Sequence, residues 1–549
     1  MNIASIWISL YNQLNLSTMK KILNFLLIIV LLKGIVWSFL IPLWHFPDEQ
    51  AHFGHIAYIV ESPIKNLGKV KDLTEEIAIS EEMLGTFRDE HGNNRFTYHP
   101  DYNLEYTGTL TGKYESEIKS LSISTRNNFV AKESAYYPHF FYSISSWIYK
   151  AFYNSNLFIR VFTIRLFWLF LYLITVYLTF LITELIFSEK SLLPLVTTIM
   201  VGFHPMFNFV SSGITSDNLH NFLFSAMIYF SLKLLLKPNL TTWLGLLIVL
   251  GLGLVNKQQF FIAFAVIFPV FFIILLRYPK KIIQYLIYLP LFLVMAFIFD
   301  FEYTKDLMKI FFQGKLPYST LIQSSKQVLL PDYSLINHFI WSIKHTVREV
   351  IPWYWGVFKW LGVVLPRWVN KVLNRLVLVA AIGIIVKFIK IIKSRQIFKY
   401  QGLIFITYTA FIYFFALLFW DWGFFRNNNF SFGIQGRYYF PVIIPHMILL
   451  SLGVKEIFGL FGKMAAKLSL IALSLWFIFL NFIALYIAIN SYYDLSSLDI
   501  FLTQASQYKP FFAKGWWLII ILALYILFLF IFLYKMTKQI LLVRKNDQK

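Results

Sequence analysis

The sequence predicts an all-α polytopic membrane protein with a single transmembrane domain over residues 1–549. Of the 549 residues, 58% are hydrophobic and only 14% are charged, and the mean hydropathy is +0.62. Soluble globular chains carry about 25% charged residues. Apolar runs of spanning length recur along the chain, and basic residues gather at their ends. There is no cysteine, so disulfides and thiolate metal sites are excluded.

About twelve membrane-spanning helices are expected, because a helix needs roughly 17 to 25 mostly apolar residues to cross the hydrocarbon core. The first run follows Lys20 and Lys21 and has no small-residue cleavage site after it, so it is predicted to be a helix and not a cleaved signal. The expected spans are residues 22–43, 157–187, 192–211, 219–236, 243–255, 260–276, 282–299, 372–389, 403–420, 438–453, 468–489 and 516–534.

The basic clusters fall on alternate connections, near Lys190, near Lys237, at 277–281, 387–399 and 455–467, and at both ends of the chain. Cytoplasmic loops carry such an excess of Lys and Arg, so both termini are predicted to be cytoplasmic. The formal charge of +21 is scattered and forms no basic stripe. A nucleic-acid partner is therefore not expected; the expected partner is the lipid bilayer of the cell membrane.

Three external segments are predicted, at 44–137, 300–370 and 421–437. The first loop holds fifteen of the 28 acidic residues against nine basic ones, the reverse of the cytoplasmic loops. Within the second, residues 336–365 are aromatic-rich but interrupted by charges that would be expensive in lipid. We therefore expect an interfacial or re-entrant amphipathic segment there in preference to a further span.

An acid motif follows the first span directly. Pro47 suits the first turn of a helix, and Asp48 and Glu49 favour the positive end of its dipole. Asp48, His52 and His55 then share one helix face. Ionisable groups at a membrane boundary indicate a functional site. The alternatives are that the acids only cap the helix while the histidines contact headgroups, or that they bind a metal, although no full zinc motif is present.

Further polar residues are predicted on the same external side. Asp217 opens the fourth span and Lys257 lies between the fifth and sixth, where the positive-inside rule disfavours a lysine. Gln435, Arg437 and Tyr438 open the tenth span, and an arginine can hold a phosphate bidentately. Arg165, near the outer end of the second span, adds a cation. Helix capping and headgroup snorkelling are the alternative explanations for these residues.

Two carboxylates and two or three cations on one face of a hydrophobic bundle form a coherent chemical set. A carboxylate accepts a proton from an attacking hydroxyl, and the cations stabilise a departing phosphate. This chemistry is that of glycosyl transfer from a lipid-phosphate donor outside the cytoplasm. The alternatives are a transporter or flippase of a lipid-linked glycan, for which no internal repeat is found, and a non-catalytic subunit of an envelope-polymer assembly.

Six stretches of the sequence resemble the multipass membrane proteins of domain-of-unknown-function family 2142, which look like C-type (GT-C) glycosyltransferases, enzymes that use polyprenyl-phosphate sugars. They cover roughly residues 44–445, and the first and last are the most specific as a pair. The stretches are PDEQAHF at Pro47, YYPHFFY at Tyr136, SDNL at Ser216, NKQQ at Asn256, WYWGVFKWLGVVLP at Trp353 and GIQGRYYFPVIIP at Gly433.

The resemblance implies a GT-C-like bundle with the acid motif of the first external loop as its catalytic centre. Asp48 is then the preferred general base of an inverting hexosyl or pentosyl transferase, with Glu49 as the substitute assignment. The donor is a polyprenyl-phosphate sugar and the acceptor an envelope glycan or glycopolymer. Substrate-binding roles are expected for His52, Arg165, Asp217, Lys257, Gln435, Arg437 and Tyr438. No cofactor is firmly implied and no metal ligands are assigned, although a divalent cation remains possible.

Overall fold

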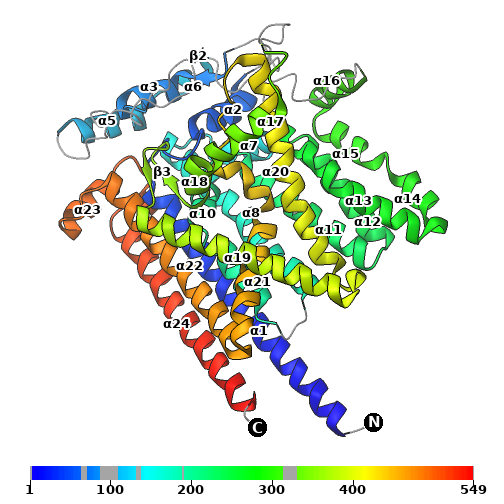
Figure 1. Ribbon diagram of the computed structural model, residues 1–549. Helices are drawn as coiled ribbons and strands as arrows, with labels where there is room; N and C mark the ends of the chain where they lie inside the picture. Colours follow the sequence, from blue (N-terminus) through cyan, green and yellow to red (C-terminus); the bar gives the residue numbers. More distant parts are fainter. Residues whose placement is uncertain are drawn as a thin grey trace.

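The computed structural model describes residues 3–62, 71–86, 109–131, 138–187, 191–312 and 330–547. Parts of the first two predicted external segments lie outside the described residues, including Tyr136 and Tyr137 of the second similar stretch. Figure 1 shows a bundle of long helices with both chain ends at one end and several short helices at the other.

Among the described residues, eight helical stretches are long and apolar enough to cross a membrane, or nine if one bent pair counts as a single span. They belong to α1 (Ile3–Leu40), α8 (Leu157–Ile186), α11 (Asp217–Leu236), α13 (Ile262–Arg277), α20 (Gln401–Asn428), α21 (Ile443–Phe458), α22 (Lys463–Tyr492) and α24 (Trp516–Asp547), with the bent pair α9 (Leu193–Gly202) and α10 (Pro205–Ser211). The predicted all-α polytopic fold is confirmed.

The predicted count of twelve spans is not confirmed, although each expected range is helical. The ranges 243–255 and 282–299 fall on shorter apolar helices, α12 (Leu240–Leu254) and the pair α14 (Ile282–Tyr288) and α15 (Leu291–Phe299). The range 372–389 lies inside α19 (Arg367–Ser394), which carries basic residues along its length and is not among the candidate spans. Apolar composition therefore located the helices but did not determine how each meets the bilayer.

The third expected span is broken where α9 gives way to α10, with a bend of 58°. Pro205 lacks the N–H that would continue the helix, and His204 caps α10 by accepting a hydrogen bond from the Phe207 N–H at 3.2 Å. The break frees the Gly202 carbonyl. Tyr172 donates to this carbonyl at 2.7 Å, and the buried ammonium of Lys33 on α1 donates to it as well.

Helices α19 and α21 pack on one another through glycines. A methyl group at Gly383 or at Gly453 would collide with the backbone of the facing helix. Small residues allow such close backbone approach where lipid leaves no hydrophobic driving force between helices.

The first external segment forms a small layer over the bundle, away from the two chain ends (Figure 1). Its described elements are α2 (Glu49–Glu61), α3 (Glu75–Leu84), α5 (Thr109–Ser120), α6 (Ser124–Asn127) and α7 (Phe140–Ala151), with β1 (Leu73–Thr74) pairing antiparallel to β2 (Phe129–Ala131).

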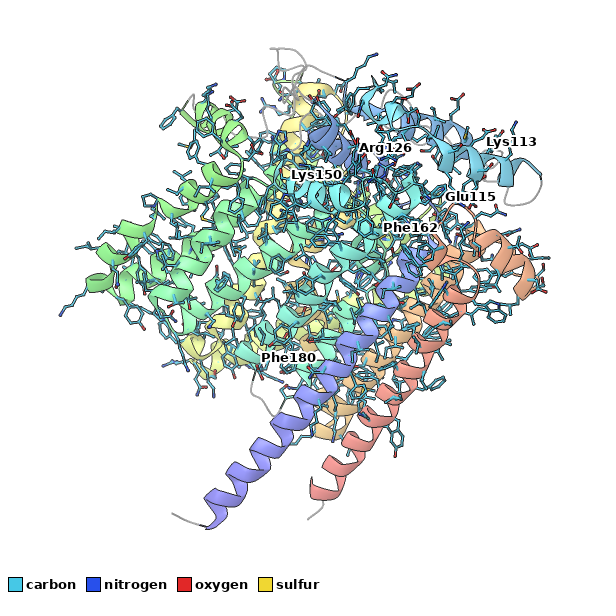
Figure 2. All side chains as sticks on the ribbon, turned by 180° about the vertical axis from the view of Figure 1, so that it is seen from behind. Lys113, Glu115, Arg126, Lys150, Phe162 and Phe180 are labelled. Atoms are coloured by element: carbon cyan, nitrogen blue, oxygen red, sulfur yellow. The ribbon has the colours of Figure 1, made fainter. Side chains whose placement is uncertain are left out.

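One buried and one partly exposed ion pair hold this layer to the bundle. Glu76 on α3 pairs with Arg160 at the start of α8, and Arg160 donates to the Tyr149 hydroxyl at 2.7 Å. Glu115 on α5 pairs with Lys514 just before α24 and accepts from the Tyr508 N–H at 2.9 Å. Figure 2 shows Glu115 at the end of the bundle away from the chain termini. The layer is therefore fixed at both its edges.

The second external segment contains α16 (Phe301–Phe312), α17 (Leu335–His345), a π-helical turn η5 (Thr346–Val350), α18 (Ile351–Trp355) and the hairpin β3 (Val357–Phe358) with β4 (Val363–Val364). α17, η5 and α18 follow one another without a break from Leu335 to Trp355, yet this run is not among the candidate membrane spans. α17 exposes Ile336, Ile340 and Ile343 on one face and packs against α20 with the other. This arrangement suits the expected interfacial segment.

Candidate functional site

The acid motif forms a tight turn between α1 and α2. Asp48 adopts the left-handed conformation, with φ of 56°, immediately before the first residue of α2. Aspartate and asparagine tolerate this region better than other residues with a Cβ. The Asp48 carbonyl accepts from the His52 N–H at 3.0 Å, so the turn leads straight into the helix.

Glu49 and Arg165 form a fully buried pair behind this turn. Arg165 Nε lies 2.7 Å from Glu49 Oε1, and Arg165 Nη2 lies 2.5 Å from Glu49 Oε2. The same guanidinium donates to the carbonyls of Ser38, Ile41 and Pro42, each at 3.0 Å. Glu49 also accepts from the Trp44 N–H at 3.2 Å. The pair thus ties the end of α1 to the start of α2.

Asp48 pairs instead with a residue distant in the sequence. Arg437 Nη2 lies 2.7 Å from Asp48 Oδ2, and the two side chains are 6% and 20% exposed. Arg437 lies in η7 (Gly436–Val442), a 3-10 segment leading into α21. Gly436 permits this position, because a methyl group there would collide with the backbone nitrogen of Tyr354 on α18. Because the Asp48 side chain is 20% exposed and that of Glu49 is fully buried, Asp48 is the more accessible of these two acids.

The second ion pair joins Asp217, the first residue of α11, to Lys257 in the turn between α12 and α13. The Lys257 ammonium lies 5.7 Å from the centre of the Tyr438 ring, and the Arg437 guanidinium lies 5.5 Å from the same ring. Tyr438 is thus shared by the two pairs. Asp48 with Arg437 and Asp217 with Lys257 consequently belong to one site.

His52 lies on α2 one turn beyond Asp48, and its Nδ1 is 2.8 Å from the Tyr142 hydroxyl. Burial is the largest influence and lowers the pKa of His52 to about 4, while the charges of Asp48, Asp217, Lys257 and Arg437 all act on it. The ring is therefore neutral at pH 7. His55 contacts the Tyr142 ring too, at 4.1 Å between centroids, so both imidazoles meet one tyrosine.

The structure brings together Asp48, His52, Asp217, Lys257, Arg437 and Tyr438 from four separate parts of the chain. Arg165 and Glu49 lie behind the turn with no exposed surface. Gln435 is half-buried at the start of η7. Three supporting residues were not singled out from the sequence. They are Tyr142, which contacts His52, and Gln259 and Tyr413, which donate to the Tyr438 carbonyl at 3.0 and 3.1 Å; the first two lie inside the similar stretches.

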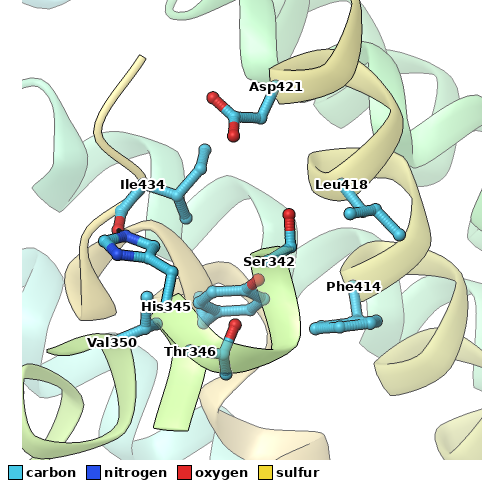
Figure 3. Close-up of a pocket in the computed structure, with 9 residues that line it drawn as sticks. Ser342, His345, Thr346, Val350, Phe414, Leu418, Asp421 and Ile434 are labelled. Carbon is cyan, nitrogen blue, oxygen red and sulfur yellow. Dashed lines mark hydrogen bonds between the residues drawn. The ribbon is translucent and has the colours of Figure 1, made fainter. Parts of the chain in front are cut away.

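A small cavity lies beside η7, between α17, η5 and α20 (Figure 3). Its volume is about 20 Å³, and its lining includes Ser342, His345, Asp421 and Ile434. This is room for about one water molecule. His345 Nε2 lies 3.3 Å from the Ile434 carbonyl, and Asp421 accepts from the Phe432 N–H at 2.8 Å. The cavity therefore belongs to the support of the segment that carries Arg437.

No group of three or more His, Asp or Glu side chains that could hold a metal ion occurs within the described ranges. Each site carboxylate has a cation as its neighbour. The arrangement provides two acids, two cations and a neutral imidazole, which suits proton transfer and the binding of an anion.

A family model described as "Predicted membrane protein (DUF2142)" matches residues 31–445, which contain every stretch named above. The chain belongs to the DUF2142 family. It is a multipass membrane protein, as the family description and the apolar helices both indicate. No curated protein matches the sequence.

Several solved structures are similar to this DUF2142 chain. ArnT from Cupriavidus metallidurans, in the apo state, is 12% identical, with a TM-score of 0.39 over 89% of this chain and 77% of ArnT. ArnT bound to undecaprenyl phosphate also gives 0.39 and 12%, over 84% and 75% of the two chains.

The oligosaccharyltransferase AglB from Archaeoglobus fulgidus, in complex with an inhibitory peptide and a dolichol-phosphate, is 14% identical. Its TM-score is 0.42 over 86% of this chain and 55% of AglB. The DUF2142 chain thus spans about half the length of AglB. At these scores neither similarity defines what the chain binds or does.

Proposed function

We propose that the protein is an inverting membrane glycosyltransferase that moves a hexosyl or pentosyl group from a polyprenyl-phosphate donor to an envelope glycan acceptor outside the cytoplasm. The observation that carries the proposal is the meeting of two acid–cation pairs, Asp48 with Arg437 and Asp217 with Lys257, around Tyr438. Asp48 directly precedes α2, which lies at the end of the bundle away from both chain termini (Figure 1).

Asp48 is the general base of the proposed reaction. The acceptor hydroxyl gives its proton to the Asp48 carboxylate while its oxygen bonds to the anomeric carbon of the donor. The bond from that carbon to the phosphate oxygen breaks, and the electron pair leaves with the lipid phosphate. Glu49 is a poorer base, because Arg165 and backbone N–H groups already occupy its buried oxygens.

Arg437 and Lys257 bind the phosphate in this scheme. Arg437 holds Asp48 through Nη2, while its buried Nε atom has no hydrogen-bond partner among the described residues. An unpaired buried N–H of a guanidinium favours an anionic ligand, because charge-assisted hydrogen bonds are the strong ones. Lys257 is 24% exposed, so its ammonium can reach a ligand without giving up Asp217.

The remaining assigned residues orient the reactants or the site. Asp217, His52 and Gln435 face the sugar or the acceptor, and Tyr438 separates the two cations. For Arg165 we propose a positioning role in place of substrate binding, because its guanidinium is fully buried against Glu49 and the carbonyls at the end of α1.

The test is turnover by the purified protein. It is incubated with radiolabelled polyprenyl-phosphate hexoses and pentoses, and release of the free lipid phosphate is measured. We expect release with at least one donor, and we expect Lys257→Gln and Arg437→Gln to weaken donor binding at least tenfold. Unchanged donor affinity in both variants would reject the phosphate role. A magnesium and chelator series in the same assay tests whether a divalent cation takes part.

One observation favours a second candidate, a flippase for a lipid-linked glycan. The broken pair α9 and α10 with the buried Lys33 beside it resembles the interrupted helices of transporters. A flippase would move a labelled lipid-linked sugar across proteoliposome membranes without releasing lipid phosphate. Loss of that movement on replacing Lys33, with normal movement by Asp48→Asn, would favour the flippase over the transferase.

A further inference from the structure

The face of α11 that continues inward from Asp217 carries an unusual set of buried polar groups. Asp217, His220 and Asn221 lie at positions i, i+3 and i+4, so they share one face of the helix. His220 is 1% exposed and Asn221 is 2% exposed. His220 lies one turn from Asp217, and its ring centre is 5.7 Å from that of Phe260, three residues after Lys257, so the ring lies close to the ion pair.

Several polar atoms on and beside this face lack hydrogen-bond partners within the part of the chain that the structure describes. Both ring nitrogens of His220 are unused, as are Asn221 Nδ2, Asn218 Oδ1 and Asn256 Oδ1. Asn256 precedes Lys257, and its Nδ2 donates to the Ser216 carbonyl at 3.3 Å. Four neighbouring side chains around one ion pair therefore offer unused donors and acceptors.

Buried polar atoms in native proteins are almost always hydrogen-bonded, so a local concentration of unsatisfied ones calls for a ligand or for ordered water. A sugar ring carries several hydroxyls, each of which both donates and accepts. With the phosphate held by Lys257 and Arg437, a sugar attached to it reaches the adjacent α11 face. Apolar rings, Phe224 and Phe260, flank His220 and limit the space for anything larger.

We infer that His220 and Asn221 form the sugar-recognition subsite of this protein and determine which polyprenyl-phosphate sugar it accepts, by hydrogen bonding to hydroxyls of the donor ring. This inference rests on the proposed function and extends it, because it separates recognition of the sugar from binding of the phosphate. A site built to hydrogen-bond a hydroxyl discriminates strongly against a donor that lacks it.

The experiment compares ligand binding with the stability of the ligand-free protein. Full-length protein in detergent is titrated with bare polyprenyl phosphate and with polyprenyl-phosphate glucose, mannose, galactose and arabinose, and affinity is read from the shift in melting temperature. We expect at least one sugar lipid to bind at least tenfold more tightly than the bare lipid phosphate.

The decisive variant is Asn221→Leu, which keeps the size of the side chain. Since Asn221 Nδ2 is unpaired without ligand, we expect the melting temperature of the ligand-free protein to stay equal or rise, because an apolar group of the same shape replaces an unsatisfied one. The same variant, and His220→Leu, should lose the tenfold advantage of the sugar lipid while retaining the affinity for bare lipid phosphate.

Ser225→Ala is the matched control, because Ser225 lies one turn beyond Asn221 on α11 and its hydroxyl is also buried without a partner among the described residues. It should leave the sugar advantage unchanged. An unaltered advantage in both Asn221→Leu and His220→Leu, or bare lipid phosphate binding as tightly as all four sugar lipids, would overturn the inference. Failure of the protein to bind bare lipid phosphate at all would instead reject the proposed function.

Discussion

At the scale of single residues, conformational strain gathers around the acid motif. Eight described residues other than glycine have positive φ, and five of these lie at the turn or at the tip of the β3–β4 hairpin: Trp44, Asp48, Lys359, Trp360 and Leu361. The Trp360 indole N–H lies 3.5 Å from the Trp44 carbonyl and so links the two regions. Each such residue costs of order 1 to 3 kcal/mol and persists only where the surroundings enforce it.

Asp48→Asn tests the general base without disturbing this strained backbone, because asparagine also tolerates the left-handed region. We expect transfer to fall at least 100-fold, since general-base catalysis contributes about 10² to 10⁴. The melting temperature should change by only a few degrees. Glu61→Gln, at the far end of the same helix, is the control and should keep its activity. Normal lipid-phosphate release by Asp48→Asn would remove the base assignment.

Glu49→Gln should lower the stability of the protein, whereas Asp48→Asn should mainly lower its activity. It leaves the fully buried guanidinium of Arg165 without its counter-charge, and breaking such a pair costs about 3 to 5 kcal/mol. The expected result is low expression or a melting temperature many degrees below wild type in detergent. A stable Glu49→Gln protein that has lost only turnover would reverse the roles given to Asp48 and Glu49.

The pKa of His52, lowered by burial to about 4, makes stability depend on pH. Its usual value near 6.5 applies to the unfolded chain, so between pH 6.5 and 4 the unfolded state binds the proton and the folded state does not. Stability should therefore fall as the pH drops through this window, by up to about 3 kcal/mol from this residue. Melting curves of wild type and His52→Gln should converge as the pH decreases; parallel curves would contradict the lowered pKa.

At the scale of elements, the site depends on how η7 is held. Gln259 and Tyr413 donate to the Tyr438 carbonyl, and α18 contacts η7 at Gly436. The 3-10 turn η7 is thus held by three elements: the segment before α13, which carries Gln259, and the helices α18 and α20. The position of Arg437 over Asp48 follows from these contacts and not from the turn's own sequence.

Gly436→Ala is the test at this scale. The added methyl would collide with backbone of α18, which cannot move aside as a flexible side chain can. We expect a lower melting temperature and at least a tenfold loss of donor affinity. Gly433→Ala is the comparison, because that glycine has φ of 78° but no atom within 4 Å of the position that a methyl group would take; it should cost only about 1 kcal/mol of stability. Equal effects in the two variants would refute the role of the contact.

At the scale of the whole molecule, the bundle separates the chain termini from the layer that carries the site (Figure 1). The basic connections at 277–281, 387–399 and 455–467 are expected on the cytoplasmic face by the positive-inside rule, and so are both termini. We therefore propose that the layer containing α2, α3 and α7 faces outward, together with Asp48 and Arg437.

The natural absence of cysteine makes this orientation directly testable. A membrane-impermeant maleimide should label Lys113→Cys, on the exposed surface of α5, in intact cells. Lys399→Cys, exposed in the connection before α20, should react only after the cells are permeabilised. Labelling of Lys399→Cys alone in intact cells would place the layer on the cytoplasmic side, and labelling of both variants would contradict the opposite placement of these two connections.

The fold class could be predicted from the sequence because apolar length and basic flanks are local properties. The acid motif could be predicted for the same reason. Pro47 and Asp48 indicate the start of a helix through their own residue types, whatever their partners in the folded protein are. The number of spans could not be predicted from apolar runs alone. α12 and α15 are short and α19 carries basic residues, so whether each of them crosses the membrane depends on how it packs against its neighbours. The break within the expected span over α9 and α10 could not be predicted either, since Pro205 alone does not reveal a bend of 58°.

The sequence by itself determined that the chain is a multipass helical membrane protein whose acids and cations lie on the connections between its apolar runs. Only the tertiary structure decided which acid meets which cation. Asp48 and Glu49 are adjacent and chemically alike, yet one meets Arg437 at the edge of the site and the other is buried against Arg165. The physical reason is that consecutive residues at a helix start point in different directions, and their partners come from helices more than a hundred residues away.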